Sequence, residues 1–233
     1  MIFSKECAMQ QVTRLLHQYN GLRISNMDET EISLAGHIFV NRVAKGYWLY
    51  KEYQVEIVIP LASDDLPNVK DAGNHIDKSY PHRYANGELC LETDTNIKIR
   101  FIDGFDLNAW MSEYVETYFF TYEFYIRYGE FPFGERAHGI EGIIQTYGEL
   151  FHEVDYGKVL KILESIANHK YRGHSLCPCG SALKFRSCHG KFAMKYYADD
   201  RLKLIVQKDY IAIMEVLEKT YEQQRNMFKT KPR

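Results

Sequence analysis

Three cysteines and a histidine are gathered in the segment Cys177–Gly190, in the last third of the 233-residue chain. The four residues are Cys177, Cys179, Cys188 and His189. Zn²⁺ prefers four thiolate or imidazole ligands at tetrahedral corners, and these side chains complete that set without leaving a position for a substrate. Three thiols this close together without a metal would be prone to oxidation. The pattern therefore predicts a structural zinc site, and chemistry has to be sought elsewhere.

The loop 177–190 reads Cys-Pro-Cys-Gly-Ser-Ala-Leu-Lys-Phe-Arg-Ser-Cys-His-Gly. It resembles the SEC-C motif, which is named for the C-terminal tail of the SecA translocation ATPase and is attached to many unrelated bacterial proteins. Ala182 departs from that motif, in which glycine is common here. The resemblance implies a module that binds a protein partner. The basic residues Lys184, Arg186 and Lys191 also suit an anionic partner.

Cys90 is a second thiol whose surroundings suggest chemistry. It lies in the sequence Tyr-Pro-His-Arg-Tyr-Ala-Asn-Gly-Glu-Leu-Cys-Leu-Glu, residues 80–92. A cysteine exchanges acyl groups because its thiolate is a good nucleophile and its thioester is activated toward amines and other thiols. Gly87 permits a tight approach or a positive φ beside it. The alternative is an inert core position, because a cysteine between two leucines is ordinarily a small buried hydrophobe.

The segment 80–92 resembles the active-site signature of ubiquitin-conjugating enzymes. That signature runs His-Pro-Asn, four residues, Gly, two residues, Cys-Leu. Its proline, glycine, cysteine and leucine are matched without a gap by Pro81, Gly87, Cys90 and Leu91. The resemblance implies a cysteine-dependent acyltransferase in which Cys90 carries a protein C-terminus as a thioester and transfers it to an amine or another thiol.

Two residues depart from the signature. Tyr80 stands where the family has histidine, and His82 stands where it has asparagine. By resemblance Tyr80 braces the loop. The resemblance implies that His82 would donate a hydrogen bond to the oxyanion that forms when an amine attacks the thioester, or would act as a base toward Cys90. Such substitutions resemble the divergent bacterial members of the superfamily, found in anti-phage (CBASS-type) signalling operons with a cyclic-dinucleotide synthase.

The resemblance also bears on partners. The donor would be a ubiquitin-like protein or the C-terminal tail of a cyclic-oligonucleotide synthase. The chain shows no adenylating domain, so it would need a separate activating enzyme or a pre-activated donor. The alternative is a catalytically inactive adaptor whose zinc motif binds a protein or nucleic acid. A net charge of −2 gives no general attraction to nucleic acid, although the stretch Lys184–Lys195 is locally basic.

The elements that must position Cys90 follow from hydrophobic periodicity. We expect an α+β fold of the ubiquitin-conjugating type: a first helix, an antiparallel β-meander, a long irregular loop and an aromatic-rich helix. Loops of that length are often functional. The predicted ranges are a helix over 5–19, strands over 22–25, 31–42 and 47–60, a loop over 61–87 and a helix over 107–128.

Helical periodicity resumes after residue 139, over 140–151, 159–167, 192–197 and 202–228. We therefore expect a conjugating-enzyme-like domain over 1–139 and a helical C-terminal region over 140–233 that carries the zinc loop. Apolar residues make up 45% of the chain, enough for a sizeable core. The longest apolar runs are far shorter than a membrane span, and no signal-peptide pattern opens the chain. With five cysteines and no disulfide framework, we expect a cytoplasmic protein.

Overall fold

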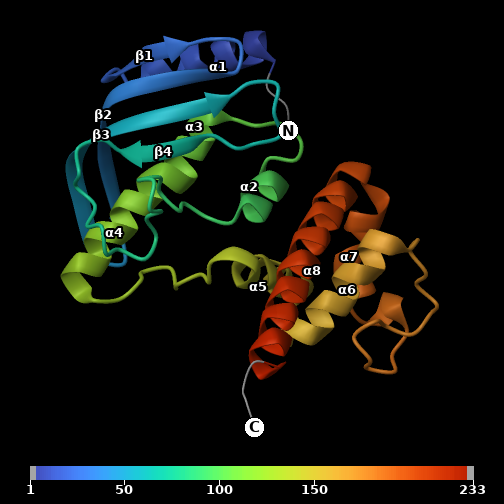
Figure 1. The fold of residues 1–233 in the computed structure, drawn as a ribbon. Coiled ribbons are helices and arrows are strands. Elements are labelled where there is room, and N and C mark those ends of the chain that lie inside the picture. The colour runs from blue at the N-terminus through green and yellow to red at the C-terminus, as the bar shows by residue number, and fades with distance from the viewer. Residues whose placement is uncertain (1–3, 230–233) are drawn as a thin grey trace. The chain divides into compact units, whose positions relative to one another are not determined.

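The computed structural model describes residues 4–229 (Figure 1). In chain order its elements are α1 Lys5–Gln18, β1 Leu22–Met27, β2 Glu31–Ala44, β3 Tyr47–Pro60, β4 Asn68–Asp71, α2 Asp94–Arg100, α3 Leu107–Trp110, the π-helical turn η1 Met111–Val115, α4 Glu116–Tyr128, α5 Gly139–Phe151, α6 Tyr156–Asn168, the 3₁₀ turn η2 Phe185–Ser187, α7 Gly190–Ala198 and α8 Asp200–Lys229.

Contacts divide the chain into two compact units. The first unit takes in the described residues up to Asp94 together with Asp103–Glu135, and so contains the sheet with α1, α3 and α4. The second unit takes in Thr95–Ile102 and the described residues from Arg136 onward, and so contains almost all of α2 together with α5 to α8. The functional boundary after residue 139 stays a prediction.

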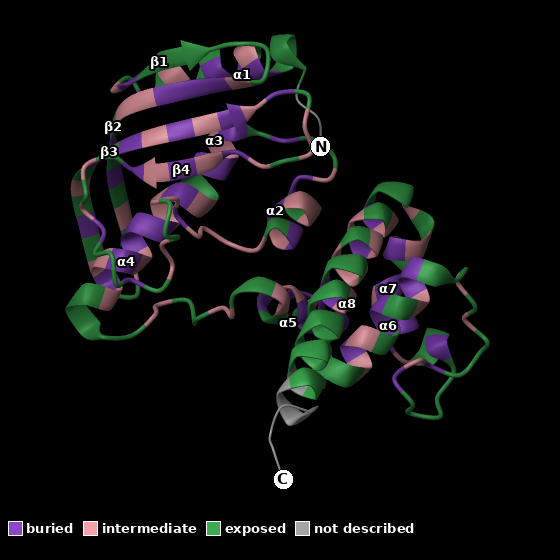
Figure 2. Cartoon of the chain, in the orientation of Figure 1, coloured by how far each residue is buried: buried purple, intermediate pink, exposed green. Residues whose placement is uncertain are grey.

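The four strands form one antiparallel sheet in the order β1-β2-β3-β4. A two-residue turn joins β2 to β3, and both of its residues, Lys45 and Gly46, have positive φ, at 50° and 73°. Such turns match the twist of the strands they connect. More and less buried positions alternate along most of both strands (Figure 2), except at Ile32–Leu34 of β2, where three consecutive residues are buried. The buried face consists of Ile32, Leu34, Ile38, Val40, Leu49, Tyr53, Val55, Ile57 and Ile59.

Helices cover that buried face. The backbone stays right-handed through α3, η1 and α4, so 107–128 is one continuous helix with a π turn inside it. Tyr53 of β3 stacks on Phe119 of α4, with ring centroids 4.1 Å apart. At the end of α1, the Tyr19 hydroxyl donates to Glu116 at 2.6 Å. These features confirm the expected α+β class, a meander with flanking helices, and the helix predicted over 107–128.

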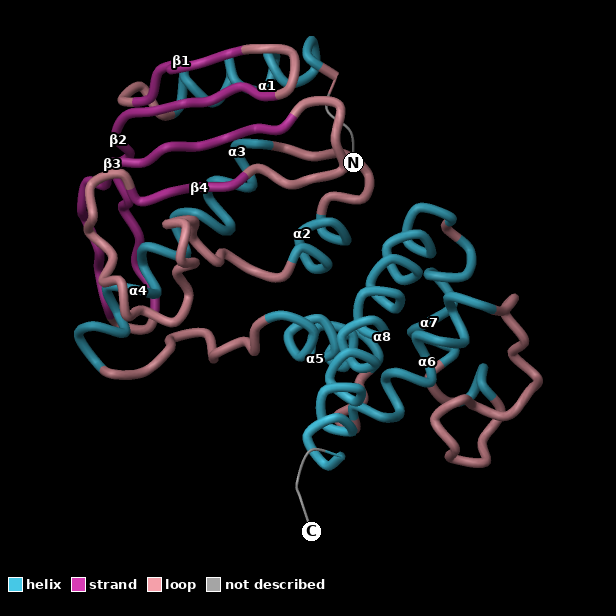
Figure 3. The backbone as a smooth tube through the Cα atoms, in the orientation of Figure 1, coloured by secondary structure: helices cyan, strands magenta, loops and turns pink. Residues whose placement is uncertain are grey.

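Two elements were missed in the sequence. The strand β4 lies inside the segment expected to be an irregular loop (Figure 3). It was not predicted because its four residues are too few to display a period. Val69 and Asp71 nevertheless alternate with less buried neighbours. The helix α2 is also short, and it is fixed by a distant partner: the Thr95 hydroxyl donates to Asp209 of α8 at 2.8 Å. No local pattern reports a contact between residues so far apart.

The second unit is helical, as predicted for this part of the chain. The hydroxyl of Tyr147 in α5 donates to the same Asp209 carboxylate at 2.7 Å, so one acidic side chain joins three helices. No helix within residues 4–229 is long and apolar enough to cross a membrane. Fully buried side chains of this core include Tyr147, Phe151, Ile162, Leu163, Ile166, Tyr196, Val206 and Ile213.

Candidate functional site

The zinc loop connects α6 to α7 and is folded by its own backbone. The Cys177 N–H donates to the Leu183 carbonyl at 2.8 Å, which closes a tight turn over the residues between them. Gly180 lies in that turn with φ of +81°, a conformation that L-residues rarely adopt. Phe185 is buried and anchors the loop, its ring 6.0 Å from that of Tyr197 in α7. The loop is therefore held on the helices of the second unit.

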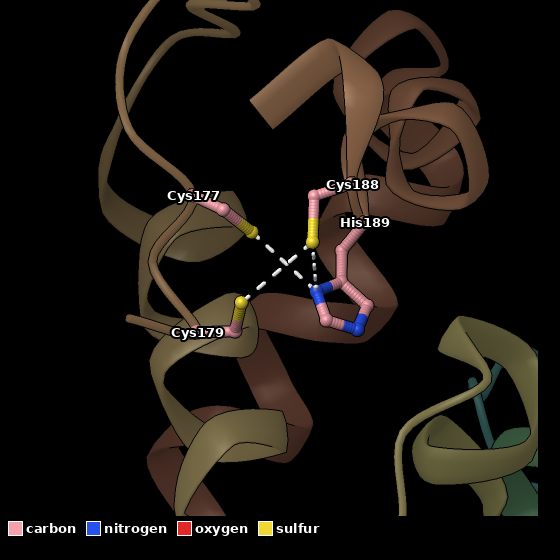
Figure 4. Close-up of side chains that lie close together, drawn as sticks. All are labelled: Cys177, Cys179, Cys188 and His189. Carbon is pink, nitrogen blue, oxygen red and sulfur yellow. Dashed lines mark hydrogen bonds between the residues drawn. The ribbon is translucent and has the colours of Figure 1, made fainter. Parts of the chain in front are cut away.

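The four predicted ligands converge (Figure 4). Their ligand atoms all lie within 4.8 Å of one another. The Sγ atoms of Cys179 and Cys188 are 3.8 Å apart, and the Nδ1 atom of His189 lies 3.4 Å from Cys177 Sγ and 3.3 Å from Cys188 Sγ. Tetrahedral zinc, with Zn–S distances of about 2.3 Å, separates its ligand atoms by roughly 3.5–3.8 Å. The four residues therefore fit a zinc ion.

Protonation at this cluster follows from burial and hydrogen bonding. Burial raises the pKa of Cys177 to about 12, and burial also lowers the pKa of His189. The pKa of Cys179 is lowered because hydrogen bonds, from Ser181 among others, outweigh the opposing effect of burial. A neutral imidazole is the form that ligates metal, whereas the thiols must lose their protons. Zinc binding by this cluster therefore releases protons.

One further carboxylate reaches the cluster. The Oε2 atom of Glu153 lies 3.5 Å from Nε2 of His189, the ring nitrogen that points away from the sulfurs. Glu153 is far from the loop in sequence, in the connection between α5 and α6, and it was not predicted. The predicted basic residues Lys184, Arg186 and Lys191 are all exposed.

The Cys90 loop, residues 80–92, belongs to the first unit. Its backbone is folded around the carbonyl group of His82. The carbonyl oxygen of His82 accepts from the Cys90 N–H at 2.8 Å and from the Tyr118 hydroxyl of α4 at 3.0 Å. The Leu89 N–H donates to Val69 of β4 at 2.9 Å. Strand β4 and helix α4 thus fix both sides of the loop.

Gly87 closes the tip of this loop. Its N–H donates to the Tyr84 carbonyl at 2.9 Å, and its φ is +88°. Of the two alternatives that the sequence left open for Gly87, a tight approach or a positive φ, the structure shows the positive φ. A side chain at this position would meet only the end of Arg83, at 3.7 Å, so conformation rather than space selects glycine.

The Cys90 thiol is half-buried. The Tyr84 hydroxyl donates to its Sγ atom at 3.4 Å, and a ring nitrogen of His82 lies within 4.8 Å of it. Burial raises the pKa of Cys90; the hydrogen bond from Tyr84 acts against that rise, and the charges of Glu92 and Asp94 add to it. The thiol is therefore predominantly protonated at neutral pH.

Tyr80 is buried below this loop. Its ring lies 5.0 Å from that of Tyr122 and 5.6 Å from that of His82, measured between centroids. Burial raises the pKa of Tyr80. The position suits the predicted bracing role, because the ring supports His82 from the helix side. The sequence did not single out Tyr84, which is exposed, or Tyr118, which is buried, since nothing in their spacing separates them from the chain's other tyrosines.

The comparisons with known proteins concern the zinc loop. The family model of the SEC-C motif matches residues 175–191, which include all four predicted ligands. Together with the converging side chains, this match confirms a zinc-binding motif of the SEC-C type. No curated protein and no solved structure matches the chain. The resemblance of the first unit to ubiquitin-conjugating enzymes stays a prediction.

Proposed function

We propose that the chain is a ubiquitin-conjugating-enzyme-like transferase that carries a protein C-terminus as a thioester on Cys90. The observation that carries the proposal is the setting of this thiol. Cys90 is half-buried at the end of a loop tied to β4 and α4, with an imidazole within 4.8 Å and a phenolic hydroxyl at 3.4 Å. An inert core cysteine has no need of a hydroxyl that donates to its sulfur or of an imidazole nearby.

The reaction consists of two acyl transfers. In the first, the Cys90 thiolate attacks the carbonyl carbon of a donor already held as a thioester on an activating protein. A new C–S bond forms, the old one breaks, and the released thiolate takes up a proton. In the second, an amine or thiol acceptor attacks the Cys90 thioester; a C–N or C–S bond forms, Cys90 leaves as thiolate, and the acceptor's proton passes to solvent or to a nearby base.

His82 and Tyr80 have separate tasks in this scheme. The His82 ring either donates an N–H to the oxyanion of the tetrahedral intermediate or takes the Cys90 proton. Because the pKa of Cys90 is raised, formation of its thiolate during loading calls for such a base. Tyr80 holds the His82 ring from below and does not touch the reacting atoms.

The donor is a ubiquitin-like protein or the C-terminal tail of a cyclic-oligonucleotide synthase, delivered by a separate activating enzyme. This assignment places the protein in bacterial anti-phage signalling, and the zinc loop serves as its docking element. It rests on resemblance to divergent bacterial conjugating enzymes. The genes adjacent to this one provide a direct check. A nucleotidyltransferase gene with an effector gene would indicate anti-phage signalling. A gene for a ubiquitin-like protein beside one for an activating enzyme would indicate a conjugation cascade.

The test uses the full chain with the candidate donor, activating enzyme and ATP. The expected product is an adduct on Cys90 that is cleaved by thiol reductant, and Cys90→Ser should give a reductant-resistant ester or none. Cys7→Ser is the matched control, because Cys7 is exposed and far from this loop in sequence. An adduct that persists in Cys90→Ser and is still cleaved by thiol would refute the proposal.

A catalytically inactive adaptor is the second candidate, and the raised pKa of Cys90 favours it. In this case the first unit only binds a partner and Cys90 is a packing residue. Conjugation activity would be absent with every donor, and partner capture would survive Cys90→Ala. Binding of nucleic acid by the basic loop predicts instead an affinity that falls steeply with salt and flattens in Lys184→Ala.

A further inference from the structure

We infer that Glu153 is a positioning residue for the zinc site: it accepts the Nε2–H of His189 and so reserves Nδ1 for the metal. Glu153 lies outside the SEC-C match at 175–191, in the connection between α5 and α6. Its Oε2 atom is 3.5 Å from His189 Nε2, and both side chains are 11% exposed.

The orientation of His189 identifies the tautomer. Its Nδ1 atom faces the thiols of Cys177 and Cys188 at 3.4 and 3.3 Å, and its Nε2 atom faces the carboxylate (Figure 4). A neutral imidazole has one N–H and one lone pair, so a carboxylate at Nε2 holds the proton there and leaves the Nδ1 lone pair free. Metal-bound histidines commonly have such a partner, which fixes the ring and raises its basicity.

Glu153 is itself held in place from two sides. Its other carboxylate oxygen, Oε1, accepts the backbone N–H groups of Val154 and Asp155, both at 3.0 Å. Lys158 approaches Oε2 at 3.8 Å. The side chain is thus fixed by its own loop before any metal arrives, as a positioning group requires.

The backbone of Glu153 is fixed by the end of α5. The Glu153 N–H donates to the Gly148 carbonyl at 2.9 Å, and His152 before it is left-handed, with φ of +56°. This is the Schellman arrangement of a helix C-terminus. A Cβ at Gly148 would come within 2.7 Å of the Glu153 carbonyl oxygen. The His152 ring also packs on Phe192 of α7, with centroids 4.3 Å apart, close to His189 in sequence.

The zinc loop is therefore not a self-sufficient module in this chain. One of its ligands is oriented by a residue that the α5–α6 connection supplies, so metal affinity depends on the folded helices of the second unit. A substitution in the α5–α6 connection should therefore change the zinc affinity.

The test measures zinc affinity of the full chain by competition with a chromophoric chelator. Glu153→Ala removes the acceptor and should weaken zinc binding by about 10- to 100-fold, whereas Glu153→Gln keeps a neutral acceptor and should lose less. Gly148→Ala, which displaces the Glu153 backbone, should weaken binding in the same direction. Glu149→Gln is the matched control: it removes a neighbouring carboxylate that pairs with Arg136 at 2.9 Å and should stay within about twofold of the parent.

Nitrogen NMR of the His189 ring supplies a readout independent of affinity. The parent should show zinc on Nδ1 and a slowly exchanging Nε2–H, and Glu153→Ala should show faster exchange of that proton. The inference is overturned if Glu153→Ala stays within about twofold of the parent, if Glu149→Gln weakens zinc equally, or if zinc is found on Nε2. Should Glu153→Ala unfold the helices of the metal-free chain, seen as lost circular dichroism, the Glu153→Gln affinity and the proton exchange decide.

Discussion

The zinc loop and the Cys90 loop both present thiols, yet they are built in opposite ways. In the zinc loop the four ligands lie within one short segment, and their atoms converge within 4.8 Å. In the Cys90 loop, the backbone is fixed by β4 and by Tyr118 of α4, which lies 36 positions from the carbonyl it contacts. A site made from local residues is readable as a pattern, whereas one made from distant elements has to be folded first.

The protonation of the two loops differs as well. The zinc cluster needs thiolates, which a divalent cation stabilises directly. At Cys90, burial is the main cause of a raised pKa; the hydroxyl of Tyr84 opposes that rise, and the charges of Glu92 and Asp94 add to it. The zinc loop is thus suited to hold its thiolates permanently, and the Cys90 loop to form one only during reaction.

Removal of the metal should separate the two loops most strongly. Cys177→Ser, or zinc chelation, should destabilise the second unit by several kcal/mol, since structural zinc contributes on the order of 10 kcal/mol in small zinc domains. Hydrogen exchange measured by mass spectrometry should show protection lost in α6 and α7 and retained in β2 and β3. Loss of protection in β2 and β3 as well would contradict the expectation that the metal stabilises the second unit alone.

The pH dependence of alkylation should sharpen the contrast next. Because burial raises the pKa of Cys90, its thiolate fraction should grow about tenfold per pH unit from neutral pH upward and level off only above the range of an ordinary thiol. The measurement is the iodoacetamide rate at Cys90 in a Cys7→Ser background. A rate that is already level at pH 7 would mean that the thiol is activated.

The two turn glycines offer a matched pair. Gly87 and Gly180 have φ of +88° and +81°, and neither has a close neighbour that a Cβ would strike. Each change to alanine should therefore cost roughly 1–2 kcal/mol of strain. Denaturant unfolding of Gly87→Ala measures the first cost directly. The cost at Gly180 should appear instead as weaker zinc binding, and an unchanged zinc affinity would show that the turn adapts.

The smallest effect is expected from two hydroxyls. Tyr84 and Ser181 each place a hydroxyl oxygen 3.4 Å from a sulfur, Cys90 and Cys188 respectively. Tyr84→Phe should raise the pKa of Cys90 further and slow alkylation at pH 8 by about threefold, in keeping with the loss of one weak hydrogen bond. Ser181→Ala should leave zinc affinity nearly unchanged, because the metal dominates that sulfur. If loss of the hydroxyl changed alkylation at Cys90 and zinc affinity by equal factors, the two loops would not differ in how much a single hydroxyl matters to their thiols.

Several features could be predicted from the sequence because they are local. The spacing of Cys177, Cys179, Cys188 and His189 identifies the ligands, and alternation over 31–60 identifies the long strands. The residue type of Gly87 allowed either a tight approach or a positive φ, and the structure has the second.

Other features depend on contacts that no local pattern encodes. Glu153 reaches His189 from the far end of α5, and Tyr84 turns back onto Cys90 only because the loop tip folds over. Likewise β4 exists because β3 offers it a partner. In each case tertiary packing determines which residue or strand becomes the contact partner, and the local sequence does not encode that choice.

The placement of α2 has a consequence for the order in which the protein can assemble. Thr95 emerges from the ribosome 114 residues before Asp209, the carboxylate that it contacts. The strands β1 to β4 can pair while α2 still lacks its helical partner. Because the chain leaves the first unit at residue 94 and re-enters it at 103, helix α8 completes a contact at a segment that was synthesised long before it. A truncation within α8 should therefore be detectable at residue 95.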